Sequence, residues 1–255
     1  MAQFTVTGEV DPFLHVSLQQ GEKIYCESNA MVMMEDTLDL KGKMGGFGQA
    51  LMRSFANGES LFQQHIEAVR GAGDCLLSPV LMGGMQILDV GTNSYCLSDG
   101  AFVAAEANVS LVSKMEKLSV QGVLMSMFGQ AGGFFYSQAS GFGKLVVSGM
   151  GSLFTLDVEP NKDIIIDNAH VVAWDSQLQH KVSLSTGQDT GLVNRLVNSV
   201  TSGEGVVLRF SGKGKVVICS RNKENFVKWI ASSVGSGSHS NSSGFNFNFG
   251  AGNGS

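Results

Sequence analysis

Gly141-Phe142-Gly143-Lys144 is a short turn sequence that recurs as Gly71-Ala72-Gly73-Asp74 and Gly212-Lys213-Gly214-Lys215. The first glycines of the three motifs are 70 and 71 residues apart. Strand-forming residues such as Val146 and Val147 follow each motif. A phosphate-binding glycine loop would be followed by a helix, so the motifs predict β-hairpins and argue against a dinucleotide site.

A second landmark repeats with the same period. A turn and an apolar strand occur at Ser28-Asn29-Ala30-Met31-Val32, Asp99-Gly100-Ala101-Phe102-Val103 and Asp167-Asn168-Ala169-His170-Val171. The pairs Tyr25-Cys26 and Tyr95-Cys96 also match, 70 residues apart. Independent landmarks with one period predict three tandem repeats. We place them at residues 12–80, 81–150 and 151–221.

Each repeat has room for roughly six short strands, and a unit of this size is marginal as an independent domain. Packing of the repeats edge to edge would bury the remaining apolar surface and protect the strand edges. The sequence therefore predicts an all-β protein of three small sandwiches or barrels in a pseudo-threefold arrangement.

The C-terminal part of the sequence differs from the repeats. Phe226, Trp229 and Ile230 have the spacing of one helical face, which predicts a short helix at residues 222–231. Residues 232–255 are rich in Ser, Gly, Asn and Phe, which predicts a disordered tail. The tail is interpreted as solvated, with a partner-recruiting segment as the alternative.

Charge and hydropathy exclude several classes of partner. The net charge is −5 and the 17 basic residues are scattered, so no nucleic-acid partner is expected. No apolar run approaches the ~20 residues of a membrane-spanning helix. The start of the chain lacks the features of a secretory signal, so an intracellular, most simply cytoplasmic, location is expected.

The residues that could carry chemistry are dispersed, so no catalytic, cofactor-binding or metal site is predicted. His170 is assigned to the strand position that Met31 and Phe102 fill in the other repeats. His65 is assigned to extra length in repeat one and expected to be exposed. Glu59 and Glu204 occupy equivalent places, and they are interpreted as solvent-facing or turn-capping rather than catalytic.

Apolar segments lie between the two landmarks of each repeat, and in a pseudo-threefold body they would gather on one face. Exposed apolar patches of this kind typically bind partners. We therefore expect a homo-oligomer or a protein partner to bind there, and the alternative is that the segments fold inward. The residues that represent this surface are Phe47, Leu51, Met125, Phe128 and Leu196.

Three stretches resemble the altered-inheritance-of-mitochondria-24 type family over roughly residues 12 to 221. They are Tyr25-Cys26-Glu27-Ser28-Asn29-Ala30-Met31, Gly58-Glu59-Ser60-Leu61-Phe62, and Gly203-Glu204-Gly205 with Gly212-Lys213-Gly214. The resemblance implies three copies of a fold like that of the tryptophan RNA-binding attenuator protein, related to the double-stranded β-helix. It also implies a role in mitochondrial organisation and a possible mitochondrial location. It supplies no catalytic residues, and RNA binding is not carried over because no stripe of Lys or Arg is present.

The favoured function is a non-enzymatic scaffold or binding protein of unknown specificity. The alternative is a small-molecule or carbohydrate binder that uses clefts between the repeats. A hydrolase or cupin-like enzyme is the third hypothesis, and a metal bound by histidines would favour it.

Overall fold

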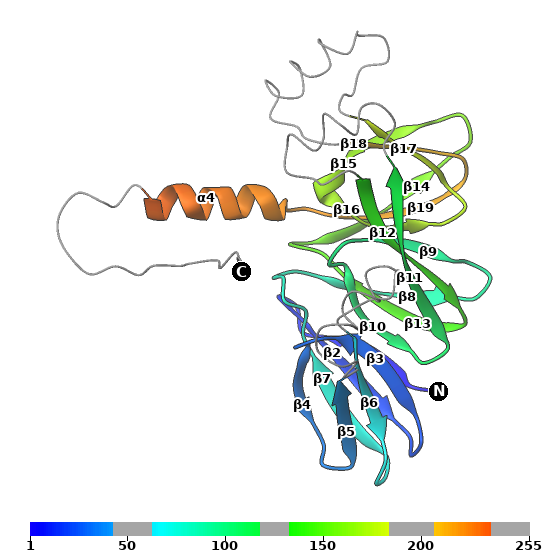
Figure 1. The fold of residues 1–255 in the computed structure, drawn as a ribbon, viewed down its shortest axis with the longest axis vertical. Coiled ribbons are helices and arrows are strands. Elements are labelled where there is room, and N and C mark those ends of the chain that lie inside the picture. Colours follow the sequence, from blue (N-terminus) through cyan, green and yellow to red (C-terminus); the bar gives the residue numbers. More distant parts are fainter. Residues whose placement is uncertain (43–62, 118–132, 184–206, 236–255) are drawn as a thin grey trace, which may run out of the picture. The chain divides into compact units, whose positions relative to one another are not determined.

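The computed structural model describes residues 1–42, 63–117, 133–183 and 207–235. The chain forms two units, Met1–Asn222 and Lys223–Ser255. The first unit consists of antiparallel β-sheets, and the described part of the second is one helix, α4 (Lys223–Gly235) (Figure 1). The predicted all-β class is confirmed.

The described strands of the first unit follow one another in three sets of six, after an N-terminal strand β1 (Gln3–Thr7). Copy one contains β2 (Phe13–Leu18), β3 (Lys23–Glu27), β4 (Met31–Met34), β5 (Leu38–Gly42), β6 (Gln63–Ala68) and β7 (Gly73–Leu77). Copy two contains β8 (Met85–Val90), β9 (Tyr95–Ser98), β10 (Phe102–Glu106), β11 (Val109–Lys117), β12 (Gly133–Gly141) and β13 (Gly143–Ser148). Copy three contains β14 (Leu153–Val158), β15 (Ile164–Asp167), β16 (Val171–Asp175), β17 (Gln179–Ser183), β18 (Val207–Ser211) and β19 (Gly214–Cys219), with a 3₁₀ turn η1 (Asn168–His170) before β16.

Strand pairing inside each copy follows one scheme. The sixth strand lies between the first and the third, and the fifth lies between the second and the fourth. Each copy is therefore two layers of three strands, and alternate side chains of a strand point into the space between them. β1 extends the first layer of copy one by pairing with β2.

Consecutive copies are joined by continuous sheets. The second strand of one copy pairs with the third strand of the next, which gives the six-stranded orders β5-β6-β3-β10-β13-β8 and β11-β12-β9-β16-β19-β14. Two such junctions are present, β3 with β10 and β9 with β16. A threefold closure would need a third junction between β15 and β4, and these two strands end their sheets. The expected pseudo-threefold arrangement is therefore not confirmed.

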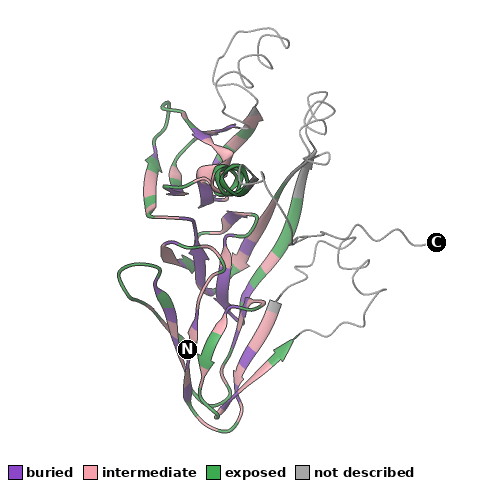
Figure 2. Ribbon diagram, turned by 90° about the vertical axis from the view of Figure 1, so that its left-hand side faces the viewer, coloured by how far each residue is buried: buried purple, intermediate pink, exposed green. Residues whose placement is uncertain are grey.

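The core runs through both junctions (Figure 2). Val103, Ala104 and Val146 of copy two belong to the apolar cluster of copy one. Cys96 of copy two belongs to that of copy three, where Trp174 and Phe210 are fully buried. Because side chains of one copy pack in the apolar core of its neighbour, each junction is stabilised by apolar burial as well as by backbone hydrogen bonds.

The Gly-x-Gly motifs are corners between two layers, which corrects the hairpin prediction. β12 pairs with β9 and β11, whereas β13 pairs with β8 and β10, although only Phe142 separates β12 from β13. Gly141 and Gly143 have φ values of 106° and 137°, which L side chains rarely adopt. A Cβ on Gly143 would lie 2.5 Å from Glu106 Oε2. Glycine is therefore required where the backbone approaches this carboxylate.

A carboxylate holds the corner in every copy. It accepts a hydrogen bond from the backbone N–H after the second glycine: Asp74 N–H to Glu35 Oε2 (3.1 Å), Lys144 N–H to Glu106 Oε2 (2.7 Å) and Lys215 N–H to Asp175 Oδ2 (2.7 Å). Bonds from backbone N–H groups to a charged acceptor are among the stronger hydrogen bonds of proteins. This carboxylate ties the end of the third strand to the start of the sixth.

The extra residues predicted for copy one lie partly in the corner that connects its fifth strand, β6, to its sixth strand, β7. Leu38 pairs with Ala68, whereas its counterpart Val109 pairs with Gly141, so more residues connect Ala68 to Gly73 than connect the matching positions in copy two. Arg70 lies in this connection and donates to Asp39 Oδ1 and to the backbone oxygens of Asp36 and Leu38, each at 2.6 Å. His65 lies outside it, on β6. The expected placement of His65 in an exposed insertion is therefore wrong.

The helix α4 begins near the expected position and continues to Gly235, beyond the expected end at residue 231. The hydroxyls of Ser232 and Ser233 donate back to the Trp229 carbonyl oxygen, three and four residues earlier in the helix, at 2.8 and 2.9 Å. Phe226 and Trp229 stack on each other along the predicted apolar face.

Candidate functional site

Most residues that the sequence singled out for partner binding lie outside the described part of the chain. They are the five representatives of the apolar loop segments, Phe47, Leu51, Met125, Phe128 and Leu196. Glu59 and Glu204, interpreted as solvent-facing or turn-capping, also lie outside the described residues. The prediction that these loops form a binding face stays a prediction.

The four described histidines have separate structural contacts. His15 Nε2 is 3.5 Å from Asp74 Oδ2, and His65 packs edge-on against Tyr25 with ring centroids 4.4 Å apart. His170 Nδ1 is 2.8 Å from the Cys219 carbonyl oxygen. His180 packs in an aromatic group with Tyr136, Trp174 and Phe210. In the described ranges, no three His, Cys, Asp or Glu side chains are grouped so as to hold a metal.

Strand register corrects the assignment of His170. Met31, Phe102 and Val171 pair with the sixth strand in the same way, opposite Leu77, Val147 and Ile218, and each pairing is followed by a bulge. Val171 therefore fills the position assigned to His170. The 3₁₀ turn η1 contains His170 and displaces it from the strand.

All four cysteines are free thiols in buried positions. Burial raises the pKa of the Cys26 and Cys75 thiols to about 12, and that of Cys96 to about 11. A protonated thiol is neither a nucleophile nor a good metal ligand. When the two junctions between copies are superposed by register, Tyr25 is equivalent to Cys96 and Cys26 is equivalent to Leu97. The two Tyr-Cys pairs of the sequence are therefore shifted by one residue relative to each other in the structure.

The feature that distinguishes one copy from the others is the outer edge of β4. Val32 and Met33 are 53% and 42% exposed. Their counterparts in β10 and β16 are 0–2% exposed: Val103, Ala104, Val172 and Ala173. The difference follows from pairing, because β10 and β16 are covered by the preceding copy, whereas no described strand covers β4, which ends its sheet. Among the described residues, β4 therefore presents apolar side chains and one edge that pairs with no other strand.

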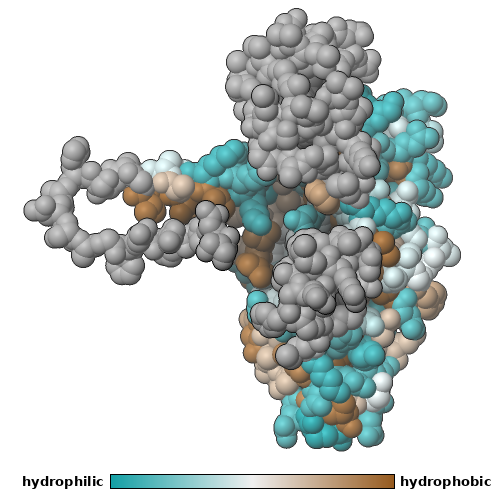
Figure 3. Space-filling view, in the orientation of Figure 1, coloured by the Kyte–Doolittle hydropathy of each residue, from teal (hydrophilic) through white to brown (hydrophobic). Residues whose placement is uncertain are grey.

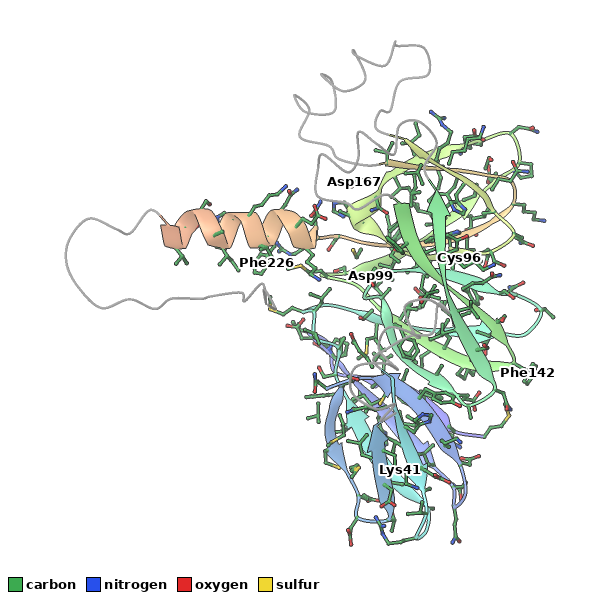
Figure 4. The ribbon with its side chains drawn as sticks, in the orientation of Figure 1. Lys41, Cys96, Asp99, Phe142, Asp167 and Phe226 are labelled. Carbon is green, nitrogen blue, oxygen red and sulfur yellow. The ribbon has the colours of Figure 1, made fainter. Side chains whose placement is uncertain are left out.

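The opposite end of the series leaves β15 at a sheet edge. β15 is the second strand of copy three, the position that β3 and β9 use to pair with the following copy. Its sequence is Ile164-Ile165-Ile166-Asp167, and Ile165 is 37% exposed. The counterpart of Ile165 at the junction of copies two and three is Cys96, which is only 5% exposed. Figure 4 labels Cys96 at that junction and Asp167 at the end of β15.

Both edges were missed by sequence reasoning, although their signal is present. β4 contains no charged residue, and β15 contains only Asp167 at its last position. Natural edge strands are usually protected by charges or proline. The lower part of the space-filling view includes apolar surface, in the region where Figure 1 places copy one (Figure 3). None of the described helices is long and apolar enough to cross a membrane.

Comparison with known proteins gives a family and two relatives. The family described as "Mitochondrial biogenesis AIM24" matches residues 4–221. An uncharacterized protein of Streptococcus pyogenes serotype M6 is 31% identical over 232 residues, which cover 88% of each chain. A crystal structure of a Streptococcus pyogenes protein from a structural genomics consortium superposes with a TM-score of 0.74. It is 29% identical and covers 91% of this chain and 100% of its own.

Proposed function

The chain belongs to the mitochondrial biogenesis AIM24 family, and we propose that it acts as a non-enzymatic binding protein that accepts a further β-strand at the edge of β4. The observation that carries the proposal is the exposure of Val32 and Met33 at a strand position that is buried in both other copies. This edge is preformed, because β4 is already held by β7 through Met31–Leu77, Met33–Leu76 and Met34–Cys75.

Strand addition would use two kinds of interaction. The backbone groups along the open edge of β4 would provide hydrogen bonds that any extended chain can make. The apolar side chains of β4 would favour a partner whose strand brings apolar residues to the same face. A binding mode that depends on an ordered edge needs no acidic, basic or nucleophilic residue at its centre, which agrees with the dispersed histidines and protonated thiols.

The hypothesis of a ligand cleft between repeats receives no support from the described junctions. They are continuous sheets in which Ala104 faces Cys26 and Trp174 faces Cys96, all of them buried. Apolar side chains from both copies fill these places.

A labelled peptide tests the proposed strand addition. The peptide spans residues 22–28, which include β3, the strand that covers β10 inside the chain. We expect saturable binding to the full-length protein by fluorescence anisotropy and no binding of a scrambled peptide. Val32→Lys should abolish binding because it places a charge at the position that pairing would bury. Val112→Lys is the matched control, since Val112 is similarly exposed (44%) and lies on the edge strand β11. Equal binding by wild type and Val32→Lys would contradict the proposal.

A further inference from the structure

We propose that the strand that pairs with β4 is β15 of a second copy of this chain, so that the protein assembles head to tail. This inference rests on the proposed strand addition at β4 and names the partner. The argument starts from the edges themselves. A second strand and a third strand of neighbouring copies pair with each other at both internal junctions, and in the described chain the second strand β15 and the third strand β4 have no such partner.

The other edge strands of the three copies do not occupy a position that pairs with a neighbouring copy. First and fourth strands are outer strands wherever they occur, apart from β2, which β1 covers. These outer strands carry charges: Asp39 on β5, Asp89 on β8, Lys114 on β11, Asp157 on β14 and Lys181 on β17. Charged side chains on an edge oppose pairing with another chain. Within the three copies, β4 is the edge strand without a charge, and the one charge of β15, Asp167, lies beyond the three positions that pair at the internal junctions.

The internal junctions fix the expected register. At both of them the pairing is antiparallel, with Ala104 opposite Cys26 and Glu106 opposite Ile24, and with Ala173 opposite Leu97 and Asp175 opposite Tyr95. Ile164 of copy three is the structural equivalent of Tyr95 of copy two. Each pairs with the same position of the fifth strand of its copy, Ile164 with Phe210 and Tyr95 with Ala139. The intermolecular pairing then sets Met33 opposite Ile166, Met34 opposite Ile165 and Glu35 opposite Ile164.

Side-chain burial supports this register. Pairing would cover Val32 and Met33 of one chain and Ile165 of the other, which are exposed by 53%, 42% and 37%. Glu35 would move from an exposed position to the environment of Glu106 and Asp175, which are 8% and 6% exposed. Its Oε2 already accepts the Asp74 N–H, so it would enter the interface with a hydrogen-bond donor in place.

Head-to-tail association differs from a twofold dimer in a way that can be measured. The two contacting surfaces are different, so every bound pair still has one free β4 and one free β15. Such a contact continues into a ring or a filament, whereas a twofold contact stops at two chains. A variant blocked at one edge can still offer the other edge to a complementary variant.

The experiment uses two full-length variants, Val32→Lys, which blocks β4, and Ile165→Lys, which blocks β15. Both side chains are partly exposed, so both variants should keep the circular dichroism spectrum of the wild type. Met33→Lys replaces Val32→Lys if the latter is unfolded. Sedimentation velocity at tens of micromolar should give assemblies for the wild type and for the control Val112→Lys. Each blocked variant alone should be monomeric. An equimolar mixture of the two should form a species of two chains and stop there, because the free β15 of one meets the free β4 of the other.

A monomeric wild type would overturn the inference, and so would a blocked variant that assembles like the wild type or a mixture that stays monomeric. Protection of the β4 amides from hydrogen exchange in a monomeric wild type would mean that another segment of the same chain covers this edge. The proposed function is tested separately by binding of the 22–28 peptide to Ile165→Lys, whose β4 is unaltered. Peptide binding with a monomeric wild type would leave strand addition intact and refute only the second copy as partner. If the peptide does not bind and the wild type is monomeric, both the strand addition at β4 and the head-to-tail assembly are refuted.

Discussion

Removal of the corner carboxylates should destabilise the copies unequally, in the order of their burial. Asp175→Ala and Glu106→Ala leave the N–H groups of Lys215 and Lys144 without the acceptor that now lies 2.7 Å away. Both carboxylates are less than a tenth exposed, so water replaces them poorly. A donor left unsatisfied in such a place costs about 1–3 kcal/mol. Glu35 has the same role in an exposed place, and its removal should cost about 0.5 kcal/mol or less.

Urea denaturation in the Val32→Lys background, whose β4 edge is blocked, is the appropriate assay, because self-association would itself add stability and would bury Glu35. We expect the unfolding free energy to fall by about 2 kcal/mol for Asp175→Ala and Glu106→Ala. For a unit of this size that corresponds to about 4–8 °C in Tm. Asp175→Asn keeps an acceptor oxygen and should recover part of the loss.

An equal loss for Glu35→Ala and Asp175→Ala would refute the reasoning, because it would mean that burial by the preceding copy does not set the cost. A loss below about 0.5 kcal/mol for both buried carboxylates would show that the hydrogen bonds to the corner N–H groups contribute little.

Three further predictions concern other parts of the chain. Gly143→Ala should destabilise the protein by about 1 kcal/mol or more, since its Cβ would meet the Glu106 carboxylate, whereas Gly100→Ala, at φ 76° with no atom within 4 Å, should cost less in a thermal melt. The Cys26 and Cys75 thiols should resist a thiol reagent until the chain unfolds. Because folding raises their pKa, they bind more protons in the folded state above the ordinary thiol value of about 8.5, so stability should fall as pH rises from there toward 12. Truncation after Asn222 should leave the melting temperature of the β unit nearly unchanged, and a large decrease would show that α4 packs on it.

The repeat period could be found in the sequence because turns need particular residues. The second glycines, Gly73, Gly143 and Gly214, start the sixth strand of their copies, so this landmark marks equivalent positions. The first glycines do not, since Ala68 rather than Gly71 holds the place of Gly141. Extra residues in one loop and fewer in another leave the period unchanged, and spacing alone cannot detect such compensation.

Pairing partners could not be predicted from the same pattern. A glycine turn between two apolar runs has the signature of a hairpin, and nothing local tells whether the runs enter one layer or two. The difference depends on Glu35, Glu106 and Asp175, which precede their corners by about 38 to 40 residues. Their spacing in the sequence matches the repeat, so a search for repeated acidic residues would have found them. The open edges depend on pairing between copies, which only the complete topology reveals.

The composition of β4 is the strongest physical argument that its edge is used. An apolar strand edge exposed to water invites uncontrolled association, and the chain protects β5 and β11 with charges. β4 instead keeps Met31, Val32 and Met33, residues that suit the covered position of β10 and β16. Methionine side chains adapt to a partner surface with little steric conflict. An edge that stays apolar where the fold already has a matching strand at the other end, with a register set twice inside the same chain, has the chemistry of an interface rather than that of a surface meant to remain in water.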